Sequence, residues 1–150
     1  MPWRVRFQTV ALRLREGLLR HPGAAGLILG APMDGPQALL FGERILEVLA
    51  EAGMEPDDAA RACYLIIVYL LGSVALEAAE LDPTRPAPPE RDRVEARRAA
   101  FDRVPAGAYP RTAAAAGTMS EYITTGQFVW GLDRLLDGLK KKGYSLPTAP

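Results

Sequence analysis

The sequence predicts an all-α domain built around one hydrophobic core. Each long segment with regularly spaced apolar residues has the period of an α-helix, and no segment shows the period-2 alternation of a half-buried strand. The chain has 150 residues, of which 49% are hydrophobic. A chain of this size buries enough apolar surface for one core and is short for two. We therefore expect a single helical bundle.

The first predicted helix covers residues 3–20. Its apolar stripe consists of Trp3, Phe7, Val10, Leu14 and Leu18. The helix ends at residues 21–23, the sequence His-Pro-Gly, because proline cannot continue a helix and glycine supplies a turn. A short apolar segment, residues 24–29, follows and stops at a stretch that contains glycine and proline.

Two longer helices are predicted at residues 37–52 and 56–80. The inward stripe of the first of these consists of Leu40, Phe41, Ile45, Val48 and Leu49, and Gly53 ends it. The next helix begins at residues 56–58, Pro-Asp-Asp. Proline is tolerated in the first turn of a helix, and carboxylates are favoured at its positive end.

The second half of the chain is less regular. Residues 82–90 contain four prolines and predict a loop, and residues 91–103 predict a charged helix. Residues 104–118 are rich in alanine, glycine and proline. A final helix is expected over residues 120–142, and we expect residues 143–150 to form a flexible tail.

The helix at 56–80 and the final helix each have two apolar faces. Cys63, Tyr64, Ile67, Leu70, Leu71 and Val74 form the first face of 56–80, and Leu65, Tyr69, Gly72 and Leu76 form the second. The final helix has a core face made of Phe128, Leu132, Leu135, Leu136 and Leu139. Ile123 and Trp130 lie on its opposite side.

These surplus faces predict a homodimer. A helix that is apolar all round is buried all round, and a small domain has few such central positions. Two surplus faces in one chain favour a four-helix seam across a two-fold axis, where Gly72 and Gly131 permit close approach of the backbones. The alternative is that the segment 82–118 folds back over both faces of the same chain.

Charge and motif content exclude several classes of function. The 18 basic and 18 acidic residues balance, so no global field attracts nucleic acid. The N-terminus has no secretory signal, and the uncharged run of 15 residues between Arg61 and Glu77 is too short to span a membrane. A cytoplasmic protein without a membrane partner is expected. His21 and Cys63 are the single histidine and cysteine, and no catalytic or phosphate-binding motif is present, so we expect no enzyme, metal site or cofactor.

Four stretches together resemble the C-terminal regulatory domain of the TetR (tetracycline repressor) family. They are Trp3 with LLRHPG (18–23), GPQALLFGERILEVLAEAG (35–53), GSVALEAAE (72–80) and FVWGLDRLLDGL (128–139). The resemblance covers nearly the whole chain, with 82–118 as a variable insertion. It implies a helical domain, residues 1–142, that dimerises and holds an effector. The N-terminal helix-turn-helix domain of the family has no counterpart in the sequence, so operator DNA is expected to contact only that part of a parent protein.

The resemblance also implies a set of effector contacts. Matching LLRHPG places family pocket positions at Val10 and Leu14, and the position of the metal-binding histidine of tetracycline repressor falls at about Ile28. Matching the Ala-Gly at 52–53 places a further drug contact at Ile45, and matching GSV places the pocket side of 56–80 at Ala60, Cys63 and Ile67. The inward stripes add three more lining residues, namely Phe41, Tyr64 and Leu71. Because the polar and metal-binding groups are missing, we expect an apolar pocket for a small hydrophobic effector.

The expected function is therefore effector binding and dimerisation in a transcriptional repressor, which a small ligand would release from its operator. Two alternatives stay open. One is a helical small-molecule carrier without a regulatory role, and the other is a purely structural dimerisation module with a fully packed interior.

Overall fold

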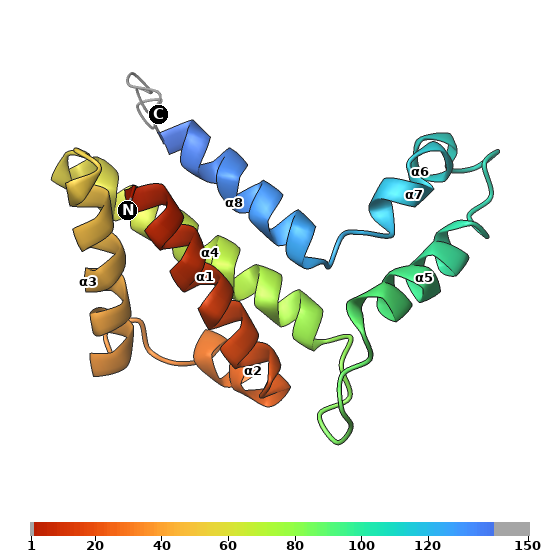
Figure 1. Ribbon diagram of the computed structural model, residues 1–150, viewed down its shortest axis with the longest axis horizontal. Helices are drawn as coiled ribbons and strands as arrows, with labels where there is room; N and C mark the ends of the chain where they lie inside the picture. The colour runs from red at the N-terminus through yellow and green to blue at the C-terminus, as the bar shows by residue number, and fades with distance from the viewer. Residues whose placement is uncertain (1, 140–150) are drawn as a thin grey trace, which may run out of the picture.

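The computed structural model describes residues 2–139, and every regular element in that range is a helix (Figure 1). This finding confirms the all-α prediction. The end of the last predicted helix and the predicted tail lie outside the described residues. The helices are α1 (Trp3–Leu19), α2 (Pro22–Leu29), α3 (Pro36–Glu51), α4 (Pro56–Ala78), α5 (Glu90–Phe101), α6 (Pro110–Ala114), α7 (Ala116–Met119) and α8 (Thr125–Leu139).

Helix α4 is the centre of the fold. It packs against α1, α2, α3 and α8, which surround it on several sides (Figure 1). The main core cluster combines Phe7 and Ala11 of α1, Ile45 and Leu49 of α3, Ile66 and Leu70 of α4, and Phe128, Leu132 and Leu136 of α8. A smaller cluster joins Leu18, Ala25, Val74 and Ala78, and Leu14 packs against both.

Prolines and one glycine set several of the helix boundaries. Pro22, Pro36, Pro56 and Pro110 each occupy the first turn of a helix, where the missing N–H leaves no hydrogen bond unmade. Gly53 follows α3 with a positive φ of 80°, a conformation that glycine adopts without strain. The predicted ends of the helices at 3–20, 37–52 and 56–80 therefore agree with α1, α3 and α4 to within two residues, and the short apolar segment after the first of them is the helix α2.

The segment from α5 to α7 forms an arm that projects away from the other helices (Figure 1). Helix α5 has no buried residue. Leu76 of α4 and Trp130 of α8 remain 66% and 59% exposed, so the segment 82–118 does not cover the outer faces of these two helices. The fold-back alternative is thereby excluded for the described chain.

Helix α8 begins at Thr125, five residues later than the sequence predicts. The Thr124 hydroxyl accepts a hydrogen bond from the Gln127 amide at 3.1 Å, as an N-cap side chain does. The Glu90 carboxylate accepts bonds from both the Thr125 amide and the Thr125 hydroxyl at 2.9 Å. Residues 120–123 form turns, so these two side chains, rather than a preceding helical turn, satisfy amides at the helix start.

Helix α4 is long and apolar enough, at 23 residues, to cross a membrane by length and composition alone. The uncharged run of 15 residues between Arg61 and Glu77 is shorter than this helix. A central helix of a soluble bundle meets the same criterion, and α4 has four neighbouring helices packed against it. We therefore treat α4 as the core helix of a bundle.

Candidate interface and ligand sites

An apolar stripe follows the outer side of α4. Its large members are Leu65, Val68 and Leu76, which are 48%, 49% and 66% exposed, and Gly72 lies between them. Spacings of three and four residues keep these positions on one side of the helix. Tyr64 extends the stripe at 64% exposure. We group this stripe with Trp130 of the neighbouring helix α8, which is 59% exposed, and call the set the outer face (Tyr64, Leu65, Val68, Gly72, Leu76 and Trp130).

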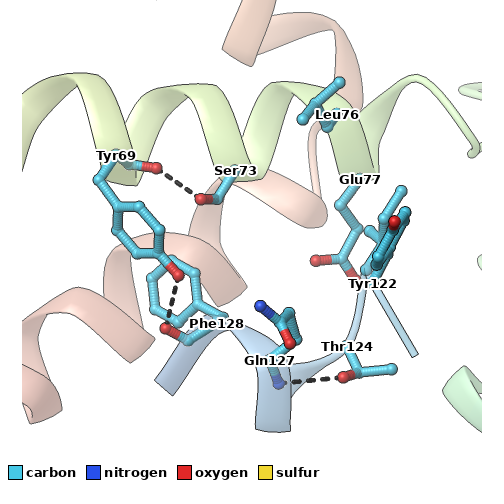
Figure 2. Close-up of a pocket in the computed structure, with 9 residues that line it drawn as sticks. Tyr69, Ser73, Leu76, Glu77, Tyr122, Thr124, Gln127 and Phe128 are labelled. Carbon is cyan, nitrogen blue, oxygen red and sulfur yellow. Dashed lines mark hydrogen bonds between the residues drawn. The ribbon is translucent and has the colours of Figure 1, made fainter. Parts of the chain in front are cut away.

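A hollow of about 130 Å³ opens beside the outer face, between α4, α8 and the connector 120–124 that precedes α8 (Figure 2). Its lining residues are Tyr69, Ser73, Leu76, Glu77, Tyr122, Ile123, Thr124, Gln127 and Phe128. Pockets for drug-sized ligands measure about 300–1,000 Å³. The hollow is therefore closer in size to a side chain than to such a ligand.

Tyr69 joins α4 to α8 at the wall of this hollow. Its hydroxyl donates a hydrogen bond to the Phe128 carbonyl at 2.9 Å, and its ring stacks on the Phe128 ring with centroids 5.8 Å apart (Figure 2). Burial raises the pKa of the Tyr69 hydroxyl. The phenol therefore stays protonated and remains a donor at neutral pH.

Gly131 makes room for the Tyr69 ring. A Cβ atom on Gly131 would overlap the Tyr69 hydroxyl, whereas a Cβ atom on Gly72 would meet nothing within 4 Å. The close approach that the sequence predicts at Gly131 is thus found within one chain, between α4 and α8. Gly72 leaves open space on the outer face.

A buried carboxylate, that of Glu77, binds two arginines beside the hollow, and we call these three residues the Glu77 cluster (Arg15, Glu77 and Arg93). The Glu77 side chain is 3% exposed, and Arg15 of α1 holds it with two hydrogen bonds of 2.9 and 2.8 Å. Arg93 of α5 adds a third bond at 2.9 Å. Arg15 also donates to the Thr125 hydroxyl at 2.9 Å and lies over the Phe128 ring. A buried carboxylate with two guanidinium partners is satisfied, and it ties three helices and the start of α8 together.

Glu77 was not predicted as a functional residue from the sequence, although a signal was present. The buried residues Cys63, Ile66, Leu70, Val74 and Glu77 recur at helical spacing along α4. A charged residue on an otherwise apolar inward stripe indicates a buried ion pair. The partners were not visible, because Arg15 and Arg93 are separated from Glu77 by 62 and 16 residues.

The nine predicted ligand contacts fall into two groups. Ile45 and Cys63 are buried in the main cluster, Leu14, Phe41 and Ile67 pack against it, and Leu71 packs against the smaller cluster. Val10, Ile28 and Tyr64 are instead 59%, 41% and 64% exposed. Ala60, the further position that the resemblance implies, is also exposed. The structure therefore brings six of the nine contacts into the packed interior and places three at the surface.

Cys63 is an interior thiol. Its sulfur donates to the Gly42 carbonyl at 3.8 Å. Burial raises the pKa of the Cys63 thiol, and the nearby charge of Glu43 acts in the same direction. A protonated, buried thiol packs as a small apolar group. Among residues 2–139 no three His, Cys, Asp or Glu side chains come close enough to hold a metal ion.

A second hollow, of about 370 Å³, lies where the end of α1, the start of α2 and the loop after α4 meet. Its lining residues are Arg15, Glu16, Leu19, Arg20, Pro22, Leu81, Asp82, Pro83, Arg85, Pro86 and Ala87. Guanidinium and carboxylate groups are nearly balanced there, so the hollow favours neither sign of ligand charge. None of the nine predicted ligand contacts lines either of these hollows.

The first 20 residues contain five arginines, and three of them bind other helices. Arg4 pairs with Asp133 and Asp137 of α8, and Arg6 pairs with Glu51 of α3. Arg15 pairs with Glu77, as described above. Most of these arginines therefore form ion pairs within the chain.

Three comparisons with known proteins give results that are consistent with one another. The sequence matches the family model "Tetracyclin repressor-like, C-terminal domain" over residues 2–142. An HTH-type transcriptional regulator from Saccharopolyspora erythraea is 37% identical over 76 residues, which are 51% of this chain and 32% of that protein. The fold is similar to that of a possible TetR family transcriptional regulator from Streptomyces coelicolor A3(2), with a TM-score of 0.72 and 35% sequence identity. That match covers 93% of this chain and 65% of the solved chain, so this chain spans only part of both relatives.

Proposed function

The chain belongs to the tetracyclin repressor-like C-terminal domain family, and we propose that it is the dimerisation and effector-binding domain of a transcriptional repressor. The family is one of transcriptional regulators rather than enzymes. The observation that carries the dimerisation part is the outer face, a contiguous apolar stripe on the central helix of the bundle with an exposed tryptophan on the neighbouring helix. Exposed apolar surface of this kind is typical of interaction sites.

In the proposed homodimer, α4 and α8 of each subunit meet their copies across a two-fold axis. The predicted interface residues Leu65, Gly72, Leu76 and Trp130 lie on the outer face, and Ile123 lines the adjacent hollow. Tyr69 and Gly131 support this interface from behind by holding α4 against α8. Stable dimers of this kind bury roughly 2,000 Å² or more in total.

Sedimentation velocity on the purified chain tests the proposal. We expect a dimer at micromolar concentration, and a monomer at that concentration would contradict it. Trp130→Glu should give monomers, because a carboxylate in a dry interface is unpaired. The matched control is Leu39→Glu, a similarly exposed position on α3, which should remain dimeric.

For the effector we propose a small hydrophobic molecule that enters between α1, α3 and α4. Leu14, Phe41 and Ile67 belong to these three helices, and they pack against the main core cluster while only partly buried. Binding there requires these side chains to separate, and the affinity would come mainly from apolar burial at roughly 25 cal/mol per Å².

A purely structural dimerisation module is the second candidate, and the packed interior favours it. Leu49, Ile66, Leu132 and Leu136 have relative exposures of 0% in that interior. A thermal-shift screen with hydrophobic compounds separates the two candidates, because a ligand that binds only the folded state raises its melting temperature. Ile67→Trp should abolish the shift while the dimer persists. A dimer whose melting temperature no compound raises would favour the structural module.

Operator binding would belong to a longer parent protein. Both relatives extend beyond the region that this chain matches. This chain has a net charge of zero, so its attraction to phosphates is weak. We expect no sequence-specific DNA complex with these 150 residues alone, and we place the parent protein in the cytoplasm.

A further inference from the structure

Arg97 connects three parts of the molecule that are distant in sequence. It lies on α5, and its side chain is only 14% exposed. One terminal nitrogen pairs with the Glu80 carboxylate just beyond α4. The Nε atom donates to the Ser120 carbonyl at 2.8 Å, and the other terminal nitrogen donates to the Ile123 carbonyl at 3.3 Å. All three nitrogens of this guanidinium are thus engaged.

The two carbonyl acceptors belong to the connector 120–124. This connector supplies Tyr122, Ile123 and Thr124 to the hollow beside the outer face. Its own apolar support is slight: Tyr122 is half exposed, and its ring has an edge contact with Phe101 at 6.0 Å between centroids. The connector therefore depends on polar contacts for its position, and Arg97 provides two of them at opposite ends.

Other hydrogen bonds shape the connector locally, because the Glu121 and Tyr122 amides donate to the Thr118 and Met119 carbonyls and the Thr124 hydroxyl donates to the Glu121 carbonyl. These bonds join residues only three positions apart, whereas Arg97 ties the connector to α5. Glu90 caps Thr125 at the start of α8, and the Ser120 hydroxyl donates to the Gly117 carbonyl. Arg93 binds Glu77 and does not reach the connector carbonyls. Arg97 is one turn further along α5 than Arg93, so both side chains lie on the same face of the helix. Their partners differ, because Arg93 binds Glu77 and Arg97 binds the connector.

We propose that Arg97 is a positioning residue for the dimer interface: its planar guanidinium clamps the connector carbonyls and so holds Ile123 and Tyr122 at the edge of the outer face. The guanidinium fork suits this role because it donates in several fixed directions at once. The proposal rests on the proposed homodimer for its consequence, while the clamp itself is a property of each subunit.

Hydrogen exchange of the full chain, followed by mass spectrometry, tests the clamp. In Arg97→Met we expect exchange of peptides covering 118–126 to rise about tenfold or more, since a local contact is lost. Peptides from α3 and the first half of α4 should exchange as in the wild type. The matched control is Arg98→Met on the same helix, because Arg98 is 57% exposed, pairs with Asp102 and lies beside Gly117, outside the connector. Unchanged exchange at 118–126, or an equal rise throughout the chain, would overturn the proposal.

Arg97→Lys separates the clamp from a simple charge effect. Lysine keeps a cation beside Glu80 but lacks the planar fork, so exchange at 118–126 should stay well above the wild-type rate. Wild-type exchange in the lysine variant would show that the ion pair alone is sufficient and would overturn the clamp.

The dimer dissociation constant then tests the consequence. We expect Arg97→Met to raise it about tenfold, equivalent to about 1.4 kcal/mol, with Arg98→Met unchanged. If the wild type is a monomer, the proposed function fails while the exchange experiment still decides the clamp. If the wild type is a dimer and Arg97→Met dimerises equally well, the positioning role fails and the proposed function stands.

Discussion

Gly131 and Tyr69 show how one absent side chain determines the contact between two helices. The Tyr69 ring occupies the space that a side chain at position 131 would fill, and from there its hydroxyl reaches the Phe128 carbonyl. Because that carbonyl lies within α8, the bond holds α4 to the backbone of α8 rather than to a mobile side chain. The spacing of the two helices therefore depends on position 131 remaining glycine.

Gly131→Ala should destabilise the protein. Overpacking a core contact costs about 1–3 kcal/mol. This loss outweighs the gain of about 1 kcal/mol that alanine brings to a helix interior. Urea denaturation should show a lower free energy of unfolding for Gly131→Ala. Gly138→Ala is the control on the same helix, where a Cβ atom meets nothing within 4 Å, and it should be neutral or stabilising. Equal effects at the two positions would refute the role of Tyr69.

The start of α8 shows how a helix boundary can depend on a distant side chain. Thr124 caps the helix locally, but the Thr125 amide is bonded to Glu90, which is 35 residues away in sequence. Burial opposes ionisation of Glu90, yet hydrogen bonds from Thr125 and the charges of Arg15 and Arg93 outweigh it and lower the pKa of Glu90. The ionised carboxylate also interacts favourably with the positive end of α8.

The contribution of Glu90 to stability should therefore depend on pH. A carboxyl group whose folded pKa is lowered stabilises the fold fully above its unfolded pKa, here 4.5, and loses this effect as the pH falls through the folded pKa. Urea unfolding of the wild type and of Glu90→Gln at several pH values measures the effect. The difference between the two proteins should be constant above about pH 5.5 and should shrink as the pH falls below about 4.5. A difference that grows in acid would contradict the lowered pKa.

At the scale of the helix, the sequence predicts those elements whose positions are marked by apolar periodicity and by proline. The apolar stripes, with Pro56, Gly53 and the His-Pro-Gly at 21–23 as boundary signals, indicate the positions of α1, α3 and α4 to within two residues. The start of α8 and the short helices α6 and α7 were not predicted, because side chains such as Glu90 and Arg97 hold this region through partners that no local pattern reveals. Leu65 and Leu76 are exposed, as a second apolar face requires, whereas Tyr64 shares their side of α4 rather than the interior.

The whole molecule consists of a packed body and an arm that charged residues hold in place. The outer face belongs to the body, and its apolar side chains are satisfied only if something covers them. Dimerisation would bury α4 on all sides, which accounts for its apolar surface in full. The Glu77 cluster lies directly behind this face and links it to α1 and to the arm.

Gly72→Ala should raise the stability of the folded subunit and lower the affinity of the dimer. Alanine at position 72 meets open space within the chain and should stabilise the helix by about 1 kcal/mol. If helices from two subunits approach at Gly72, the added methyl group obstructs them and should weaken the dimer about tenfold. Urea denaturation measured together with sedimentation equilibrium separates the two effects. An undiminished dimer affinity would place Gly72 outside the interface.

The bond between Glu90 and Thr125 has an evolutionary consequence. It joins the first residue of α5 to the first residue of α8, so the chain between them leaves the body and returns to the same point. The free energy of closing such an excursion changes slowly with its length, by roughly 0.6 kcal/mol for each doubling. Insertions and deletions between residues 103 and 115, beyond the arginines that bind the body, are therefore tolerated. Related regulators can diverge in the size and reach of this arm while they inherit the same bundle.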